Sequence, residues 1–407
     1  AYSGIEQAIV SGTGSALLTI AGTVNADVFT VTGTATRSFD LNFSGALASY
    51  SGINRFDLST NEGNDQVAVT PFYGMSGWDV SLNLNLGTGT TDTLTLFGDG
   101  GQQVVEYLPR AATGQLQING GTTAMIPGTL VTLAGVENLA FDGQGGDDAL
   151  VVTGTGALTV ATGAAVDAGI ATLSGTTPLA FSALGGAGTV AFNSQGTTDR
   201  LIVVGTALVD AFDVQAGTVR VNSQLPVSHN LTNTETVEIV GGQVGDSDSA
   251  TLTRVSGTGT VAVQTSNNSG TVTGTGPILQ LTRIEMLTLN GGAGPNNFTV
   301  SGTSTSGEQL EVLLVGGDLA DTFTVNSSGA GGVTLDGKLD NDTFNVQLGQ
   351  LLGPVTVVAS GSTGTEQMTV LGTEEADAIE VTATQIRRGT ETVGYTTSVN
   401  SLVVDGN

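Results

Sequence analysis

The side chains best suited to chemistry in this sequence are carboxylates in glycine-rich turns. Carboxylate and carbonyl oxygens are the ligands that a hard cation such as Ca²⁺ prefers, and turns crowded with Asp supply both. We therefore expect structural calcium, which a net charge of −27 also favours. Asp residues that cap backbone N–H groups at strand entries are the competing interpretation. The candidate metal ligands are Asp147, Asp148, Asp318, Asp321, Asp336, Asp340 and Asp342.

Catalytic groups are scarce. The chain has no Cys, which excludes thiol nucleophiles, thiolate zinc sites and disulfides, and His229 is its only His. Clustered carboxylates such as Asp147-Asp148 and Asp340-Asn341-Asp342 resemble those that polysaccharide lyases and hydrolases use on β-helices. Turn capping explains the same clusters without catalysis, and Arg387-Arg388 alone hardly supplies the basic groove of a lyase. We expect the protein not to be an enzyme.

Charge excludes two classes of partner. Ten basic residues stand against 37 acidic ones, and such a surface repels phosphate backbones and anionic lipids. We therefore expect no nucleic-acid partner, and no membrane insertion because no apolar run reaches 18 residues. Hydrophobic residues make up 39% of the chain, which separates it from disordered acidic tails.

Strand patterns run through the whole sequence. Apolar residues alternate with Thr, Ser, Asn and Asp, as in 82–86, 94–96 and 298–300, and Gly-Thr or Gly-Gly pairs break the runs. No window of helical length carries a 3.6-residue apolar stripe. The pattern predicts an all-β protein.

A long repeat divides the chain. The motif apolar-x-apolar-x-Gly-Thr-x-x-x-Asp-x-apolar-x-Val occurs at 18–31, 201–214 and 368–381. Its glycines, Gly22, Gly205 and Gly372, are 183 and 167 residues apart (22 to 205, 205 to 372). This predicts β-repeat modules at 1–183 and 184–365, with an incomplete third at 366–407.

A shorter period predicts the architecture. Between residues 291 and 370, strand entries recur at intervals of 21 to 25 residues, namely at Asn296, Asp321, Asp342 and Glu366. That interval fits one coil of a parallel β-solenoid, and the 11-residue step from Glu366 to Asp377 fits half a coil. Tandem small β-sandwich domains are the alternative. Five phenylalanines that share one strand position are expected to stack inside: Phe29, Phe212, Phe298, Phe323 and Phe344.

These motifs carry a resemblance. Strands separated by Gly/Asp-rich turns resemble the repeats-in-toxin family and the giant repeat proteins on bacterial surfaces. The Gly-Thr motif, followed by the Tyr-x-x-x-Val-Asn segment of 395–407, resembles long surface proteins of planctomycete-type and other environmental bacteria. The resemblance implies a degenerate β-repeat array, a secreted location at the cell surface, and calcium as a possible structural ion.

The function expected from these observations is structural. We expect an extracellular building block of a bacterial surface layer, filament, stalk or sheath. The alternatives are an adhesin that binds carbohydrate or a neighbouring cell, for which Tyr73 and Trp78 are the suitable aromatics, and a β-helix lyase or hydrolase. The chain opens and stops inside the same motif, at 2–6 and 405–407. This predicts copies stacked end to end or a longer repetitive chain, with surface polysaccharide as a further possible partner.

Overall fold

The computed structural model describes residues 7–11, 16–71, 77–110, 113–120, 129–242, 246–253, 260–266, 269–303, 309–361 and 364–406. Every regular element in these ranges is a β-strand, and none of them contains a helix long and apolar enough to cross a membrane. The chain divides into two compact units, residues 1–201 with 223–233 and residues 202–222 with 234–407. The sequence modules 1–183, 184–365 and 366–407 describe motif repetition and stay a prediction. Strand β19 (Asp199–Val204) runs across the division.

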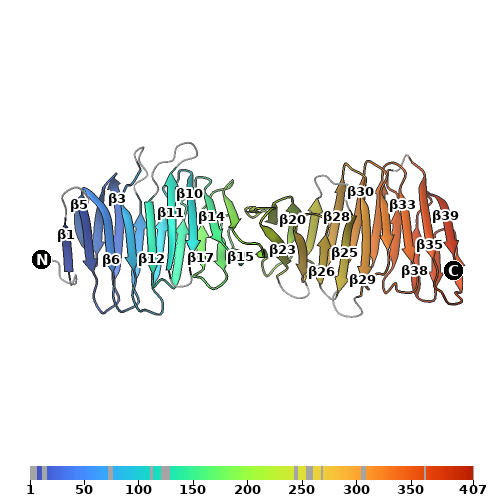
Figure 1. Cartoon of the computed structure of the whole chain (residues 1–407), viewed down its shortest axis with the longest axis horizontal. Coiled ribbons are helices and arrows are strands. Elements are labelled where there is room, and N and C mark those ends of the chain that lie inside the picture. Colours follow the sequence, from blue (N-terminus) through green and yellow to red (C-terminus); the bar gives the residue numbers. More distant parts are fainter. Residues whose placement is uncertain are drawn as a thin grey trace. The chain divides into compact units, whose positions relative to one another are not determined.

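Unit 1 contains two sheets, and Figure 1 labels several of their strands. Sheet 1A has the order β1 (Gln7–Ser11), β2 (Ala16–Ala21), β6 (Ile53–Ser59), β8 (Ser81–Asn85), β12 (Thr129–Ala134), β11 (Thr113–Gly120), β10 (Gln103–Pro109), β14 (Ala149–Gly154), β18 (Thr189–Ser194) and β22 (Val227–His229). Sheet 1B has the order β5 (Ala46–Ser51), β4 (Ser38–Phe43), β3 (Val28–Ala35), β7 (Gln66–Thr70), β9 (Thr93–Phe97), β13 (Asn138–Asp142), β17 (Leu179–Ser182), β16 (Gly169–Leu173) and β15 (Ala157–Thr162).

Unit 2 is built in the same way. Sheet 2A has the order β21 (Thr218–Val221), β20 (Ala211–Gln215), β24 (Ser249–Thr253), β28 (Met286–Gly292), β30 (Glu311–Gly317), β32 (Val333–Lys338), β34 (Val355–Val358), β38 (Glu391–Tyr395), β37 (Gln385–Arg388) and β36 (Ile379–Val381). Sheet 2B has the order β23 (Thr234–Val240), β27 (Ile278–Thr282), β26 (Ser269–Thr273), β25 (Thr260–Ser266), β29 (Asn297–Gly302), β31 (Thr322–Val325), β33 (Thr343–Gln347), β35 (Glu366–Leu371) and β39 (Val399–Asp405).

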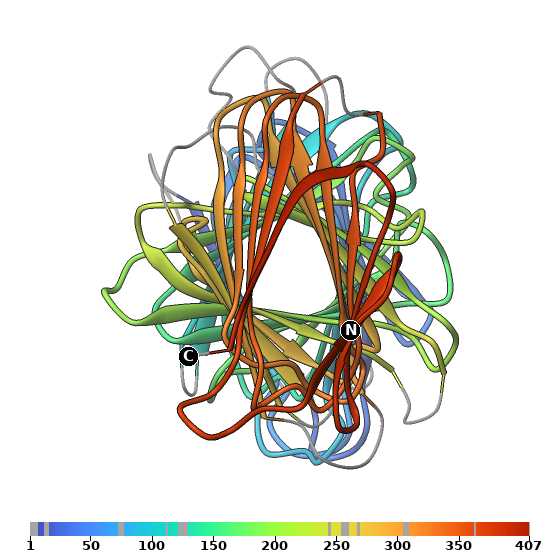
Figure 2. The ribbon, with the colours of Figure 1, turned by 90° about the vertical axis from the view of Figure 1, so that its right-hand side faces the viewer.

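Successive strands of the chain mostly alternate between the two sheets of a unit, which makes each unit a run of β-solenoid coils. Figure 2 shows the two layers for the C-terminal coils, which face the viewer. The predicted coil length is confirmed, because β29, β31, β33 and β35 pair in parallel with Phe298 beside Phe323, and Phe323 beside Phe344. The half-coil step is also confirmed, since Glu366 begins β35 in sheet 2B and Asp377 precedes β36 in sheet 2A.

Antiparallel hairpins interrupt the parallel coils, and the sequence periods did not predict them. They extend sheet 1B at β3–β5 and β15–β17, sheet 1A at β10–β12, sheet 2A at β20–β21 and β36–β38, and sheet 2B at β25–β27. A two-period strand pattern is the same in a parallel and an antiparallel neighbour, so alternation alone does not distinguish them. The all-β solenoid prediction holds, but the coils are not uniform.

The core lies between the two sheets of each unit. Phe298, Phe323 and Phe344 form the expected internal stack, with successive ring centroids 5.1 Å apart. Phe29 is buried but stacks instead on Phe43 of β4, at 4.6 Å, because the β3–β4 hairpin places that ring beside it. Phe212 is also buried.

The interpretation of Trp78 as an exposed aromatic residue suited to carbohydrate binding is wrong. Its side chain is only 2% exposed and packs edge-on against Phe39, with ring centroids 6.1 Å apart. The indole Nε1–H donates to the carbonyl of Ser38, which satisfies its polar group inside the protein. Trp78 is therefore a core residue. Tyr73 lies outside the described residues.

Phe323→Ala is expected to cost about 3–5 kcal/mol of local stability, because it removes the middle ring of the stack and leaves a cavity. In a solenoid the loss concentrates in neighbouring coils. Amide hydrogen exchange over β29–β35 measures it. Thr324→Ala changes the solvent-facing neighbour on the same strand and serves as the control. Equal exchange in both variants would contradict the inward stack.

Candidate functional site

A ladder of polar side chains, most of them buried, joins the coils of unit 2. The backbone N–H of each ladder residue donates to a side-chain oxygen of the ladder residue in the following coil. The donor and acceptor pairs are Asn296 to Asp321 (2.6 Å), Asp321 to Asp342 (2.8 Å), Asp342 to Glu366 (3.1 Å) and Glu366 to Asn400 (2.8 Å). The same bond links Asp210 to Asp248 (2.7 Å) and Asp248 to Glu285 (2.7 Å). These side chains therefore fix the register at each strand entry.

Unit 1 carries the same ladder. Its pairs are Asp27 to Asp65 (2.8 Å), Asp65 to Asp92 (2.7 Å) and Asp92 to Glu137 (2.9 Å), and Gln103 donates to Asp148 at 2.7 Å. All four aspartates are 4% exposed or less. A buried backbone N–H without an acceptor costs about 1–3 kcal/mol, so each carboxylate here removes such a cost.

Five residues before several of the ladder residues, a glycine makes room for the ladder side chain. A Cβ on these glycines would lie 2.1–2.5 Å from a terminal oxygen or nitrogen of that side chain. The pairs are Gly22 and Asp27, Gly143 and Asp148, Gly205 and Asp210, Gly291 and Asn296, Gly316 and Asp321, and Gly337 and Asp342. Gly372 and Asp377 repeat the spacing at a turn outside the ladder bonds given above. The spacing Gly-x-x-x-x-Asp/Asn is thus the sequence signal of the ladder.

The Gly-Thr motif closes the same turn. In its first copy the backbone N–H of Thr23 donates to Asp27 Oδ2 at 2.6 Å, and its hydroxyl donates to Oδ1 at 3.0 Å. Thr206 and Asp210 repeat both bonds, as do Thr373 and Asp377. The repeated motif that was visible in the sequence is a structural turn.

Burial changes the acidity of ladder carboxyls. Burial and the neighbouring charges of Glu366, Asp321 and Asp340 raise the pKa of Asp342 to about 7, although the N–H of Asp321 opposes the shift. Burial also raises the pKa of Asp148 to about 6. Oδ2 accepts no hydrogen bond in either residue. The proton affinity of both sites follows from desolvation of the carboxylate.

The structure divides the seven candidate calcium ligands into two groups. Asp148, Asp321 and Asp342 are ladder residues with exposures of 0–1%. Asp147, Asp318 and Asp340 lie in turns, and Asp336 lies in strand β32 and is 8% exposed. Hydrogen bonding brings together Asp321 and Asp342, which belong to adjacent coils.

The three turn residues have ordinary local roles or face solvent. Asp147 has a φ of 62° and accepts the N–H of Ala187 at 2.8 Å. Asp340 has a φ of 74° and accepts the N–H of Asn341. Asp318 is exposed.

Asp336 pairs with the only lysine of the chain. Lys338 Nζ lies 2.9 Å from Asp336 Oδ2, and Ser360 donates to the same carboxylate through its N–H and hydroxyl. Burial raises the pKa of Asp336, but the bonds from Lys338 and Ser360 outweigh it and lower the pKa overall. This carboxylate is already neutralised by protein groups.

One tight carboxylate group was missed by the sequence reasoning. Asp246, Asp248 and Glu285 offer oxygens that all lie within 4.8 Å of one another, which is the only such group among the residues that the structure describes. None of the seven candidates belongs to it. Asp248 accepts N–H groups of Asp210 and Gly242 and donates its own N–H to Glu285, so ladder bonds explain its position.

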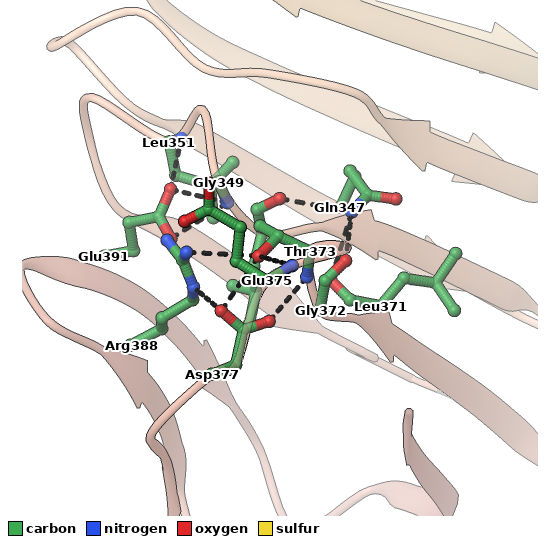
Figure 3. Close-up of polar contacts among 11 residues, drawn as sticks. Gln347, Gly349, Leu351, Leu371, Gly372, Thr373, Glu375, Asp377, Arg388 and Glu391 are labelled. Carbon is green, nitrogen blue, oxygen red and sulfur yellow. Dashed lines mark hydrogen bonds and ion pairs between the residues drawn. The ribbon is translucent and has the colours of Figure 1, made fainter. Parts of the chain in front are cut away.

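A polar cleft of about 470 Å³ lies near the C-terminal coils. Its lining residues are Asn326, Gln347, Leu348, Gly349, Gln350, Gly372, Thr373 and Glu374. Figure 3 shows the network beside it, in which Arg388 contacts Asp377, Glu391 and the hydroxyl of Thr373. Glu391 accepts the N–H groups of Gly349 and Leu351, each at 2.8 Å. Arg388 therefore links the turn of Thr373 and Asp377 to Glu391, and its charge is already paired with these two carboxylates.

The last strand of sheet 2B is less covered than the strands before it. Leu402 and Val404 of β39 are in register with Met368 and Val370 of β35, which are 1% and 0% exposed. Leu402 and Val404 occupy the same inward rows but are only partly buried. Val403, which points outward, is 51% exposed. Within the residues that the structure describes, β39 is thus a partly exposed apolar edge with one charged residue, Asp405.

Comparison with known proteins adds no family. No model of a known protein family matches the chain, and no curated protein matches it.

Proposed function

We propose that this protein is an extracellular structural protein, a non-enzymatic building block that assembles end to end into a bacterial surface layer, filament, stalk or sheath. The ladder supports this proposal, because its buried carboxylates accept backbone N–H groups from the neighbouring coil and so have a structural role. Arg388, the cation beside the polar cleft, is likewise bound by protein carboxylates.

The observation that carries the proposal is the open inner row of β39. Leu402 and Val404 continue rows that are fully buried in the preceding coil. Another coil with the same pattern would cover them, and the apolar surface removed from water would stabilise the contact. A repeat protein gains stability from each neighbouring repeat, so stacking of copies uses the same contacts as folding.

Light scattering on the purified 407-residue chain, across a range of concentrations at physiological salt, tests the proposal. We expect mass to rise with concentration, and electron microscopy to reveal linear or sheet-like particles of one width. A monomer at the highest soluble concentration would overturn it. An adhesin or a polysaccharide-degrading enzyme needs no such assembly, so that outcome would favour one of these two functions instead.

Structural calcium belongs to the same proposal. If the acidic turns bind Ca²⁺ in the folded state only, removal of the ion lowers the melting temperature and added Ca²⁺ restores it by mass action. We expect this shift when the protein melts with a chelator at fixed ionic strength, and Mg²⁺ at the same concentration is the control. Identical melts in all three conditions would leave these aspartates as caps and surface charge.

A further inference from the structure

Two edge strands lack the usual protection against pairing with another chain. Strand β5 pairs only with β4, and β39 only with β35, within the part of the chain that the structure describes. Natural sheets protect such edges with short strands, charged side chains or proline. Strand β5 has six residues without charge or proline, and β39 has seven with one charge, Asp405, at its end.

Another edge strand of unit 2 is protected. Strand β36 ends sheet 2A and has only three residues, of which Glu380 is charged and exposed. Its partner β37 contains Arg387 and Arg388. Unit 2 therefore has one edge strand with the usual protection, β36, and one without it, β39.

The two open edges match in length, direction and polarity. Strand β5 is antiparallel to β4, which is antiparallel to β3, so β5 runs parallel to the coil strands of its sheet. Strand β39 is also parallel to its sheet neighbour. Each edge exposes an apolar side chain outward, with Leu47 65% exposed and Val403 51% exposed.

Charge favours contact at these strands. Two copies that each carry −27 repel one another over most of their surfaces. Segments without charge are the places where they can approach at least cost, and salt screens the remaining repulsion beyond about 8 Å at 0.15 M ionic strength.

We propose that β39 of one copy pairs in parallel with β5 of the next copy, so that sheet 2B of the first continues into sheet 1B of the second. This inference rests on the proposed end-to-end assembly and names its contact. The interface is heterologous, because two different surfaces meet, and repetition of such a contact produces an open chain of subunits. The inward side chains Ala48 and Tyr50 would then lie beside the row of Leu402 and Val404.

Lysine substitutions test the contact. Val403→Lys and Leu47→Lys place a charge outward on each open edge without entering the core, and each is expected to raise the concentration needed for assembly roughly tenfold or more. Val381→Lys is the matched control, since Val381 is 49% exposed on the protected strand β36. It is expected to assemble like the wild type.

Cysteine cross-linking adds a positive readout, because the chain has no native Cys. Oxidation of Ser49→Cys/Val403→Cys is expected to give a series of covalent multimers, whereas Ser49→Cys/Glu380→Cys gives none. If the wild type assembles but Val403→Lys has no effect and no multimers form, the strand pairing is wrong while end-to-end assembly stands. If the wild type stays monomeric, both proposals fail.

Discussion

Asp342→Asn is expected to make unit 2 more stable than the wild type at pH 8, whereas Asp342→Ala makes it less stable. Asp342 is fully buried, and its Oδ1 holds the N–H of Asp321 at 2.8 Å. An amide keeps that acceptor and removes the buried charge. Alanine leaves the N–H of Asp321 without a partner, which costs about 1–3 kcal/mol in addition to the lost packing.

The chain itself shows that an amide fits this place. Asn296 and Asn400 are members of the same ladder. The side-chain nitrogen of Asn296 donates to the carbonyl of Gly294, two residues earlier, at 2.7 Å. Asp340 likewise stands two residues before Asp342, so its carbonyl is the expected acceptor for an amide introduced there.

The pH dependence follows from the raised pKa. Burial raises the pKa of Asp342 to about 7 in the folded protein, while an Asp in the unfolded chain titrates near 4. Between about pH 4 and pH 7 the folded state therefore binds more protons than the unfolded state, so stability falls as pH rises through this window. Each tenfold difference in proton affinity is worth about 1.4 kcal/mol, which puts the effect of this one site on the order of 2–4 kcal/mol.

Hydrogen exchange over β31 and β33 at pH 5.5 and pH 8, corrected for intrinsic exchange rates, measures this change locally. Wild-type protection is expected to be greater at pH 5.5, and Asp342→Asn is expected to remove most of the difference. Asp318→Asn, at an exposed turn position, is the control for loss of one charge. Equal pH dependence in the wild type and Asp342→Asn would refute the assignment of the proton to this carboxyl.

The coil length could be predicted from the sequence because it depends on a spacing that the chain repeats. Asn296, Asp321 and Asp342 mark strand entries in the sequence, and the same residues form the ladder in the structure. Their role was harder to predict. An Asp in a glycine-rich turn is equally typical of a cation ligand and of a cap, and the difference lies in which N–H groups surround it.

The hairpins and the partner of each strand edge could not be predicted for a different reason. The β3–β5 and β36–β38 hairpins have the same alternation as the coil strands, so only contacts distant in sequence distinguish them. Trp78 illustrates the same limit, because an aromatic residue in an irregular segment reads as exposed until Phe39 is placed beside it. The glycine five residues before several of the ladder residues was visible in the sequence, and a search for that spacing would have located these members of the ladder.

Gly143→Ala is expected to destabilise unit 1 by about 2–4 kcal/mol. The new Cβ would lie 2.1 Å from Asp148 Oδ2 and 2.7 Å from the carbonyl of Ala183, distances that real Cβ atoms do not tolerate. Asp148 is fully buried and holds the N–H of Gln103, so it moves only by losing that bond. Overpacking accounts for about 1–3 kcal/mol of this lost stability, and partial loss of the buried hydrogen bond accounts for the rest.

Urea unfolding followed by Trp78 fluorescence reports on unit 1, since this buried residue is the only Trp of the chain. Gly186→Ala is the matched control, because its Cβ would meet no atom within 4 Å in a neighbouring turn. It is expected to unfold within about 1 kcal/mol of the wild type. Asp148→Ala should reduce the added cost of Gly143→Ala, because it removes the oxygen with which the methyl group collides. Full additivity of the two substitutions, or equal stability of Gly143→Ala and Gly186→Ala, would mean that the glycine spacing does not serve the ladder.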